Sequence, residues 1–587
     1  MPSDAARRLA SASLARSIPK SSVRSPGTRS TNSLPSTVAT KFRLVIPPSN
    51  GRIAMCLPSH CGPWDANASM FGSAVMLTGV AQHRRSARQT VGMGSDVVLA
   101  IDLGTGGPKA ALIGSDGSTI GWRSRAVTTR FVDDGGAEQD PTQMWLAVVE
   151  ACRDVLDACG HPSLAAIAVT SQYMSTIPVD RSGMPTGPCI LWMDGRGAAL
   201  NRTLLNDDHV SLFLQRHGLI PLPSGHDGVA HIHVLRTHYP DSYAATAAFL
   251  EPMDYINARL TGLVRATQST MFSQLVCDNR VWGATSYDPD LVAAVRMDAD
   301  RLPQLVPMNG FIGTVSAVAA DQLGVAAGVP VAVGTIDSIT SAVGSGAMSA
   351  QDGSVIIGTT SVLVTHIGEH RSDLRSAIVA VPSPLPQQYY VMAENGIGGK
   401  ALEWAQQFMG FGSDVAAALE AAASVPPGSD GVGFAPWLTG ALAPAPNERL
   451  RGAWVGLGLT HGPAHGIRAV LEGVCLNLAW LLPVVEQFAG SQFPFVRLGG
   501  GGAQSAFWAQ ILADSLNRPV HRLTEPRATN ARGAAFLAFA DLGAIALADI
   551  PNLLQVDTIH DPISANRAIT VHGLARLQSM HRSLAAT

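Results

Sequence analysis

Short runs of apolar, mostly β-branched residues recur along the chain, and small polar residues follow them. Two such runs span residues 97–100 and 329–333. Runs of this length, bounded by turn-forming residues, predict buried strands. The first run leads to Asp102 in a glycine- and threonine-rich loop, and the second leads to Asp337 in a similar loop. We therefore expect each aspartate where a buried strand leaves its sheet.

A third loop has the same composition. The segment Gly358-Thr359-Thr360-Ser361 separates apolar runs at 355–357 and 362–364, which predicts a strand-turn-strand hairpin. The first run continues in the same way into residues 110–113. Small residues in such turns let backbone N–H groups approach an anion closely. The repeated pattern predicts two related α/β domains, each with a phosphate-binding hairpin. Taken alone, each loop could equally be a simple turn.

Between the aspartate loops, helical and strand patterns alternate. Asp140-Pro141 is typical of a helix start, and apolar residues then recur at helical spacing up to Leu156. An apolar strand pattern follows at 165–170 and another at 189–191. This alternation predicts a layered α/β domain.

Side chains suited to a hydroxylated ligand follow these two strands. A sugar or polyol site combines carboxylates, amides, arginine and an aromatic ring. The alternative is an Asp–Arg pair on the surface, with the tryptophan packed in the core. The candidate residues are Gln172, Tyr173, Trp192, Asp194 and Arg196.

The second half contains a glycine run, Gly499 to Gly502, between a strand pattern and a helical pattern that carries Trp508 on its apolar face. Glycines between a strand and a helix allow a nucleotide to approach closely. A flexible turn is the simpler alternative. Gly533-Ala534-Ala535 begins another helix, where backbone is expected to pack closely against backbone or against a flat ring.

Length and composition limit the classes of function. A chain of 587 residues exceeds a single core, which predicts at least two domains. With 46% hydrophobic residues, 14% charged residues and a net charge of −3, the sequence indicates a soluble globular protein without a basic surface for nucleic acid. No uninterrupted apolar stretch approaches the roughly 20 residues of a membrane span, so no membrane partner is expected.

Residues 1–94 differ from the rest because serine, arginine and proline dominate and no hydrophobic period persists. This composition predicts a disordered leader, typical of an organelle transit peptide. The alternative is upstream sequence translated from an early start, with Met93 as the true beginning. We expect a cytoplasmic protein, or an organellar one if the leader is a transit peptide.

In their order along the chain, these motifs resemble the FGGY family of carbohydrate kinases. The resemblance runs from about Val97 to about Gly543. It rests on the Asp-x-Gly-Thr hairpin, Gln172, the Trp-x-Asp-x-Arg segment, the loop of Asp337, Gly-Thr-x-Ser at Gly358, and the glycine run. It implies two actin-like ATPase domains of the ribonuclease H type, with an active-site cleft between them. The implied boundaries are 95–328 for an N-terminal sugar-binding domain, 329–545 for a C-terminal ATP-binding domain and 546–587 for a C-terminal tail.

The resemblance also implies an activity: ATP-dependent phosphorylation of a small sugar or polyol, with a ketopentose such as xylulose as the preferred acceptor. Asp337 would be the catalytic base and would contact the substrate, and Asp102 would position Mg²⁺. ATP and its phosphates would be bound by Gly104, Thr105, Gly358, Thr359, Gly500, Gly501 and Gln504. A homodimer is expected only by analogy.

The chain departs from the usual pattern of xylulokinases. Tyr173 stands near the place of a histidine in their Met-His-Gly segment, and Pro108 removes one N–H from the first phosphate hairpin. These departures limit the choice of substrate, and two other classes of function also stay open. One is a catalytically inactive regulator that binds sugar or nucleotide, and the other is an actin- or Hsp70-like ATPase.

Overall fold

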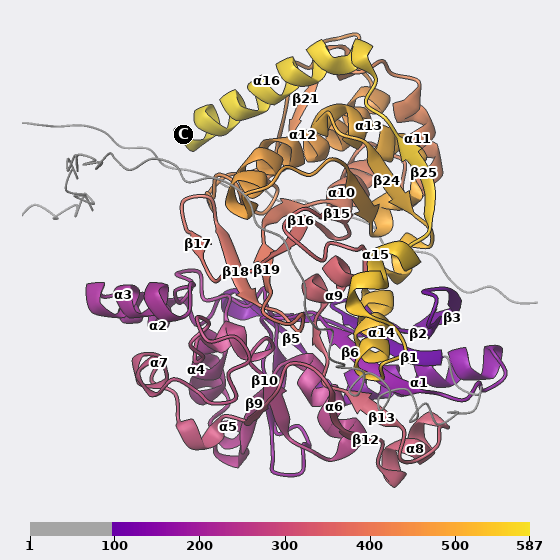
Figure 1. The fold of residues 1–587 in the computed structure, drawn as a ribbon. Coiled ribbons are helices and arrows are strands. Elements are labelled where there is room, and N and C mark those ends of the chain that lie inside the picture. The colour runs from indigo at the N-terminus through magenta and orange to yellow at the C-terminus, as the bar shows by residue number, and fades with distance from the viewer. Residues whose placement is uncertain (1–96, 587) are drawn as a thin grey trace, which may run out of the picture. The chain divides into compact units, whose positions relative to one another are not determined.

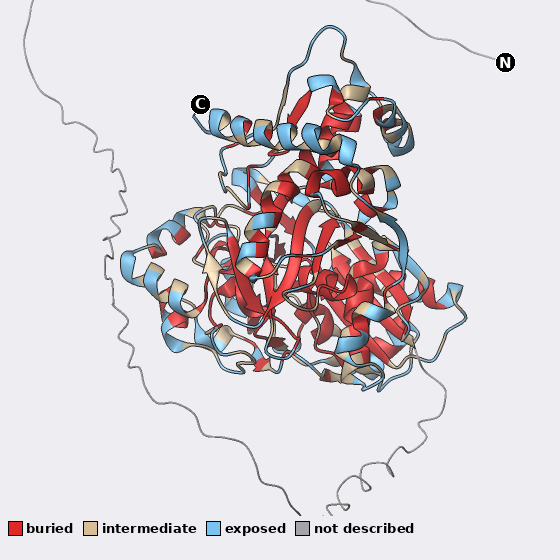
Figure 2. Ribbon diagram, turned by 45° about the horizontal axis from the view of Figure 1, so that its top comes forward, coloured by how far each residue is buried: buried red, intermediate tan, exposed pale blue. Residues whose placement is uncertain are grey.

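The computed structural model describes residues 97–586. Contacts divide the chain into residues 1–89 and 90–587, so the predicted leader lies almost wholly in the first unit and outside the described residues. Within the described part, two mixed sheets each carry helices, and their central strands, such as residues 166–171 and 353–357, are buried throughout (Figure 2).

The first sheet has the strand order β12-β13-β6-β1-β2-β3, with β14 also paired to β6. β1 and β2 form the antiparallel hairpin that the sequence predicts, while β6 pairs in parallel with β1, β13 and β14. The strands are β1 (Val97–Gly104), β2 (Gly107–Gly114), β3 (Thr119–Ser124), β6 (Ala166–Ser171), β12 (Phe311–Thr314), β13 (Pro330–Ala332) and β14 (Thr335–Ile336).

The second sheet has the order β17-β18-β19-β16-β15-β23-β24-β25, with β20 also paired to β16. It repeats the arrangement of the first sheet, since a central hairpin is followed by parallel strands. The strands are β15 (Gly353–Ile357), β16 (Thr360–Ile367), β17 (Ser372–Asp373), β18 (Ile378–Pro382), β19 (Tyr389–Met392), β20 (Glu394–Ile397), β23 (Val496–Gly499), β24 (Val520–Leu523) and β25 (Val556–His560).

Smaller strands form separate ladders beside the two sheets. They are β4 (Arg130–Val132), β5 (Gly136–Gln139), β7 (Ile177–Val179), β8 (Cys189–Ile190), β9 (Ala248–Leu250), β10 (Arg265–Thr267), β11 (Gln304–Val306), β21 (Gly433–Ala435) and β22 (Ala453–Val455).

Eight α-helices of the described residues precede Asp337. The expected start of the first is confirmed, because Asp140 caps α1 and accepts a hydrogen bond from the Thr142 backbone N–H. These helices are α1 (Pro141–Ala158), α2 (Ala198–Leu204), α3 (Asp207–Arg216), α4 (Gly228–His238), α5 (Pro240–Ala245), α6 (Pro252–Thr261), α7 (Pro289–Ala294) and α8 (Ala317–Leu323).

The later helices include the core of the second domain. Among the described helices, only α12 is long and apolar enough to cross a membrane, with a mean hydropathy of 1.6, and 72% of that stretch is buried inside the protein. These helices are α9 (Asp337–Gly344), α10 (Gly399–Phe408), α11 (Val415–Ala423), α12 (Pro463–Ala489), α13 (Ala506–Leu516), α14 (Thr529–Asp541), α15 (Ile550–Leu553) and α16 (Arg567–Ala585).

Two helices connect the domains. α9 and α14 pack along each other, and α14, from the second half of the chain, also covers β1 and β6 of the first sheet (Figure 1). They approach so closely that a Cβ on Gly533 would lie 1.8 Å from the Thr340 carbonyl oxygen. The small-residue helix at Gly533 therefore packs backbone against backbone, as one of the two expected arrangements requires.

Two expected boundaries need correction. A second domain from residue 329 is wrong, because β13 and β14 pair with β6 and so complete the first sheet. Residues 546–587 are not a tail, because β25 pairs antiparallel with β24 and α16 packs on α12. The partners of both segments lie far away in the sequence, where local patterns give no information about them.

Candidate active site

The candidate residues of the first domain gather where three strands end. β6 lies between β1 and β14, and Ser171 is paired with both Leu103 and Ile336. The next residues of these strands, Gly104, Gln172 and Asp337, therefore lie side by side. In mixed α/β sheets, ligands bind outside the carboxyl ends of parallel strands.

Asp102 lies within β1, two residues before its end, and is only 3% exposed. Lys109, its partner in the hairpin register, donates a hydrogen bond from Nζ to Asp102 Oδ2 at 3.0 Å. The Asp102 charge raises the pKa of Lys109. Sequence reasoning assigned no role to Lys109, although its position opposite Asp102 in a hairpin could have identified it.

Asp337 is the first residue of α9 and is half-buried. Burial raises the pKa of its carboxyl group well above the usual range, and the nearby charges of Asp102 and Glu394 raise it further. A carboxyl group of this kind can accept a proton at a pH closer to neutral, which suits a general base.

A hydrogen-bond network fixes the side chains around Thr105. Its hydroxyl donates to Gln172 Oε1 at 2.6 Å and accepts from Trp192 Nε1 at 3.1 Å, and Gln139 Nε2 donates to its carbonyl oxygen at 2.7 Å. Trp192 is 37% exposed, so the alternative of core packing is wrong for this ring. The Thr105 hydroxyl thus holds the indole ring of Trp192 beside the amide of Gln172, which is the neighbour of Asp337.

Asp194 and Arg196 form a buried pair rather than a surface one. The Asp194 carboxylate is 0% exposed, and it accepts hydrogen bonds from the Ala137 backbone N–H at 3.0 Å and from Arg196 Nη2 at 2.6 Å. Arg196 also donates to Glu138 at 2.7 Å. These contacts fix the segment that carries Trp192.

In the second domain, β15 and β23 run in parallel, with Ile356 opposite Gly499. The phosphate hairpin and the glycine run therefore follow neighbouring strand ends. Thr359 is exposed, and its carbonyl oxygen accepts a hydrogen bond from the Gly398 N–H at 3.0 Å, just before α10.

The glycine run needs glycine for steric reasons. Gly500 has φ +82°, and a Cβ there would lie 2.6 Å from the Ile357 carbonyl oxygen. Gln504 is exposed, and its Nε2 donates to the Gly501 carbonyl oxygen at 3.0 Å. Within the run, Gly501 is exposed beside the phosphate hairpin, whereas Gly499 and Gly502 are buried.

Tyr173 links the two domains. Its hydroxyl donates to Glu394 Oε1 at 3.0 Å, a contact between residues 221 positions apart. Burial and the charge of Glu394 raise the pKa of Tyr173, and burial raises the pKa of Glu394 to about 7. Sequence reasoning missed Glu394, since no local motif marks a residue whose partner is so distant.

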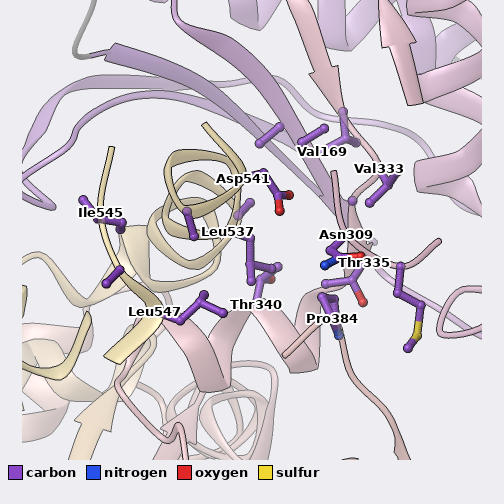
Figure 3. Close-up of a pocket in the computed structure, with 17 residues that line it drawn as sticks. Val169, Asn309, Val333, Thr335, Thr340, Pro384, Leu537, Asp541, Ile545 and Leu547 are labelled. Carbon is purple, nitrogen blue, oxygen red and sulfur yellow. The ribbon is translucent and has the colours of Figure 1, made fainter. Parts of the chain in front are cut away.

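A cavity of about 330 Å³ lies between the first sheet, α9 and α14 (Figure 3). Its lining includes Thr335, Thr340 and Leu537, together with Asp541, whose carboxylate accepts a hydrogen bond from the Gly310 N–H at 2.8 Å. Asp102 and Asp337 are not among the lining residues. The acidic pair therefore lies outside this cavity.

The donor set fits a magnesium ion that arrives with a nucleotide. Within residues 97–586, no group of three or more His, Cys, Asp or Glu side chains could hold a metal. Mg²⁺ keeps several waters and is usually bound by one or two carboxylates together with substrate phosphates. Asp102, with Asp337 nearby, supplies carboxylates of this kind.

Two sheets with repeated hairpins, a half-buried aspartate and paired glycine loops define the class of protein: a two-domain, actin-like α/β phosphotransferase. Residues 97–344 match the N-terminal domain of the FGGY family of carbohydrate kinases, and residues 353–542 match its C-terminal domain. The chain belongs to this family, which implies that ATP is a substrate.

Individual relatives cover most of the chain. The xylulose kinase of Escherichia coli is 30% identical over 75% of this chain and 89% of its own length. A glycerol kinase of Alkalilimnicola ehrlichii is 28% identical over 76% and 90%. The solved xylulose kinase of Rhodospirillum rubrum superposes with a TM-score of 0.72 at 25% identity, covering 84% of this chain and 99% of that one.

Proposed function

We propose that this carbohydrate kinase phosphorylates a ketopentose such as xylulose. The observation that carries the proposal is the strand register, which sets Gln172 and Asp337 side by side, next to Gly104 of the phosphate hairpin. Similarity to xylulose kinases favours a ketopentose as the acceptor. Because a glycerol kinase is also similar, other polyols are included among the acceptors to be tested.

Asp337 acts as the general base. It accepts the proton of the sugar hydroxyl while the hydroxyl oxygen bonds to the γ-phosphorus of ATP, the bond from phosphorus to the bridging oxygen breaks, and ADP leaves. Phosphoryl transfer depends mainly on positioning and charge stabilisation. Base assistance typically adds about 10²–10⁴-fold.

The phosphates lie between the two hairpins. Thr105 and Thr359 offer donors to the phosphates, and Gly104 and Gly358 beside them leave room for close approach, while Gly500, Gly501 and Gln504 border the adenosine. Asp102 would hold Mg²⁺, which neutralises phosphate charge when bound. Lys109 adds a positive charge beside these residues through its ion pair with Asp102.

The sugar lies against Gln172, Tyr173 and Trp192. Asp194 and Arg196 act mainly by fixing the segment of Trp192, because Asp194 is buried and each of its oxygens already accepts hydrogen bonds. Closure of the two domains over both substrates would limit transfer to water.

The test measures ADP release with ATP, magnesium and a panel of ketoses, polyols and aldonic acids. Asp337→Asn should lower sugar-dependent turnover by at least about 10²-fold. Asp321→Asn, an exposed position on α8, is the matched control and should leave turnover unchanged. Binding of ATP with no stimulation by any acceptor would contradict the proposal and favour a regulator.

A further inference from the structure

The contact between Tyr173 and Glu394 joins the two domains next to the catalytic base. Glu394 begins β20 in the second domain, whereas Tyr173 follows β6 in the first. Both side chains are half-buried, and Tyr173 comes directly after Gln172, which the strand register sets beside Asp337. Any acceptor hydroxyl near Asp337 therefore lies near this pair as well.

The pair has unused hydrogen-bonding capacity. Within the described residues, the Glu394 carboxyl group accepts a hydrogen bond from the Tyr173 hydroxyl alone, at Oε1. This leaves Oε2 of the half-buried Glu394 carboxyl group free to accept a hydrogen bond. A carboxyl group accepts hydrogen bonds and a phenol both donates and accepts them, which matches the hydroxyl groups of a sugar.

Glu394 is also directly connected to the phosphate hairpin. β20 pairs with β16, with Glu394 opposite Val362 and Ile397 opposite Thr360. The chain then continues to Gly398 and Gly399, whose N–H groups donate to the carbonyl oxygens of Thr359 at 3.0 Å and Gly358 at 2.7 Å. One short strand therefore separates Glu394 from the phosphate hairpin.

Tyr173 is held firmly from its own side. Its ring packs against Phe272 with the ring centres 5.5 Å apart. Two residues later, the Ser175 N–H donates to the buried Glu251 carboxyl group at 3.1 Å. Packing and hydrogen bonds within the first domain thus fix the position of the Tyr173 ring, and Glu394 of the second domain contacts its hydroxyl.

We propose that Glu394 is a sugar-binding residue supplied by the second domain. It binds an acceptor hydroxyl together with Tyr173, so that the sugar contacts both domains. The inference rests on the proposed kinase function. The competing interpretation is an interdomain hydrogen bond without sugar contact.

The experiment compares Glu394→Gln, Glu394→Ala and Tyr173→Phe with the wild type. Glu420→Gln, an exposed glutamate on α11, is the matched control. Initial rates give kcat and the KM values for sugar and for ATP. Calorimetry measures sugar binding to each folded variant without nucleotide, and thermal unfolding shows that the variant is folded.

Glu394→Ala should raise the sugar KM and weaken sugar binding by about 10- to 100-fold, as expected for a lost hydrogen bond to a carboxyl group. The KM for ATP should change less than about twofold, and the nearly isosteric Glu394→Gln should retain part of the sugar affinity. Sugar affinity equal to that of Glu420→Gln in both Glu394 variants would overturn the inference, even if kcat falls. No sugar-dependent turnover by the wild type would instead overturn the proposed function.

Discussion

Substitution of Gly533 by alanine tests how closely the two connecting helices must pack. Gly533 lies inside α14, where alanine is the better helix former by about 1 kcal/mol. Its added Cβ would lie 1.8 Å from the Thr340 carbonyl oxygen and 2.8 Å from the Gly344 nitrogen, whereas ordinary contacts begin at 3.4 Å. Any loss of stability must therefore come from the collision.

The size of the effect follows from these distances. To reach ordinary contact, α9 and α14 must separate by about 1.6 Å, the difference between 1.8 and 3.4 Å. Overpacking of a close contact costs about 1–3 kcal/mol. Asp337 is the first residue of α9, one helical turn before Thr340, so it moves with the helix. A displacement of about 1 Å at a reacting group can cost about 10²-fold in rate.

We therefore expect Gly533→Ala to lower both the thermal midpoint and kcat, the latter by about 10²-fold. Calorimetry and sugar-dependent ADP release measure the two effects. Gly573→Ala in α16 is the matched control, because its Cβ would first meet a movable methyl group of Leu476 at 3.0 Å. If both variants keep the midpoint and kcat of the wild type, the close helix contact has no role in placing Asp337.

Three further predictions concern charged groups. Burial raises the pKa of Glu251 to about 8 from its ordinary 4.5, so the stability that comes from its retained proton is lost as the pH rises from about 4.5 to about 8. Glu251→Gln should therefore raise the thermal midpoint more at pH 8 than at pH 5. An equal gain at both pH values would contradict this. Because the pKa of Asp337 is raised, kcat/KM should already fall at a pH well above 3.8, the ordinary pKa of an aspartate carboxyl group. A pH profile whose acid limb lies near 3.8 would be inconsistent with this burial. Lys109→Met leaves the buried Asp102 charge without its partner and should cost about 2 kcal/mol in denaturant unfolding, less than a fully buried pair because Lys109 is 42% exposed. Adding Asp102→Asn should restore most of that stability, and a double variant as unstable as Lys109→Met would refute the pairing.

Local patterns in the sequence predict much of the fold correctly. The hairpins at Asp102 and Gly358 are confirmed as β1–β2 and β15–β16. Helical spacing likewise identifies the buried face of α1, since Val148, Cys152 and Leu156 are at most 1% exposed. Hydrophobic period and turn chemistry act over a few residues, which is why they succeed for single elements.

The errors concern partners that lie far apart in the sequence. β14 completes the first sheet by pairing with β6, and β25 extends the second by pairing with β24. Most of the other strands in each of these two sheets come from other parts of the chain. The same reason explains the omission of Glu394, whose significance depends on Tyr173 and Asp337 lying beside it in space.

The most direct test of the central claim is mass spectrometry of the product after incubation with ATP, magnesium and D-xylulose. The account predicts one sugar monophosphate formed for each ADP released, and loss of both products in Asp337→Asn. ADP released without any phosphorylated sugar, from xylulose or from the other acceptors of the panel, would contradict it.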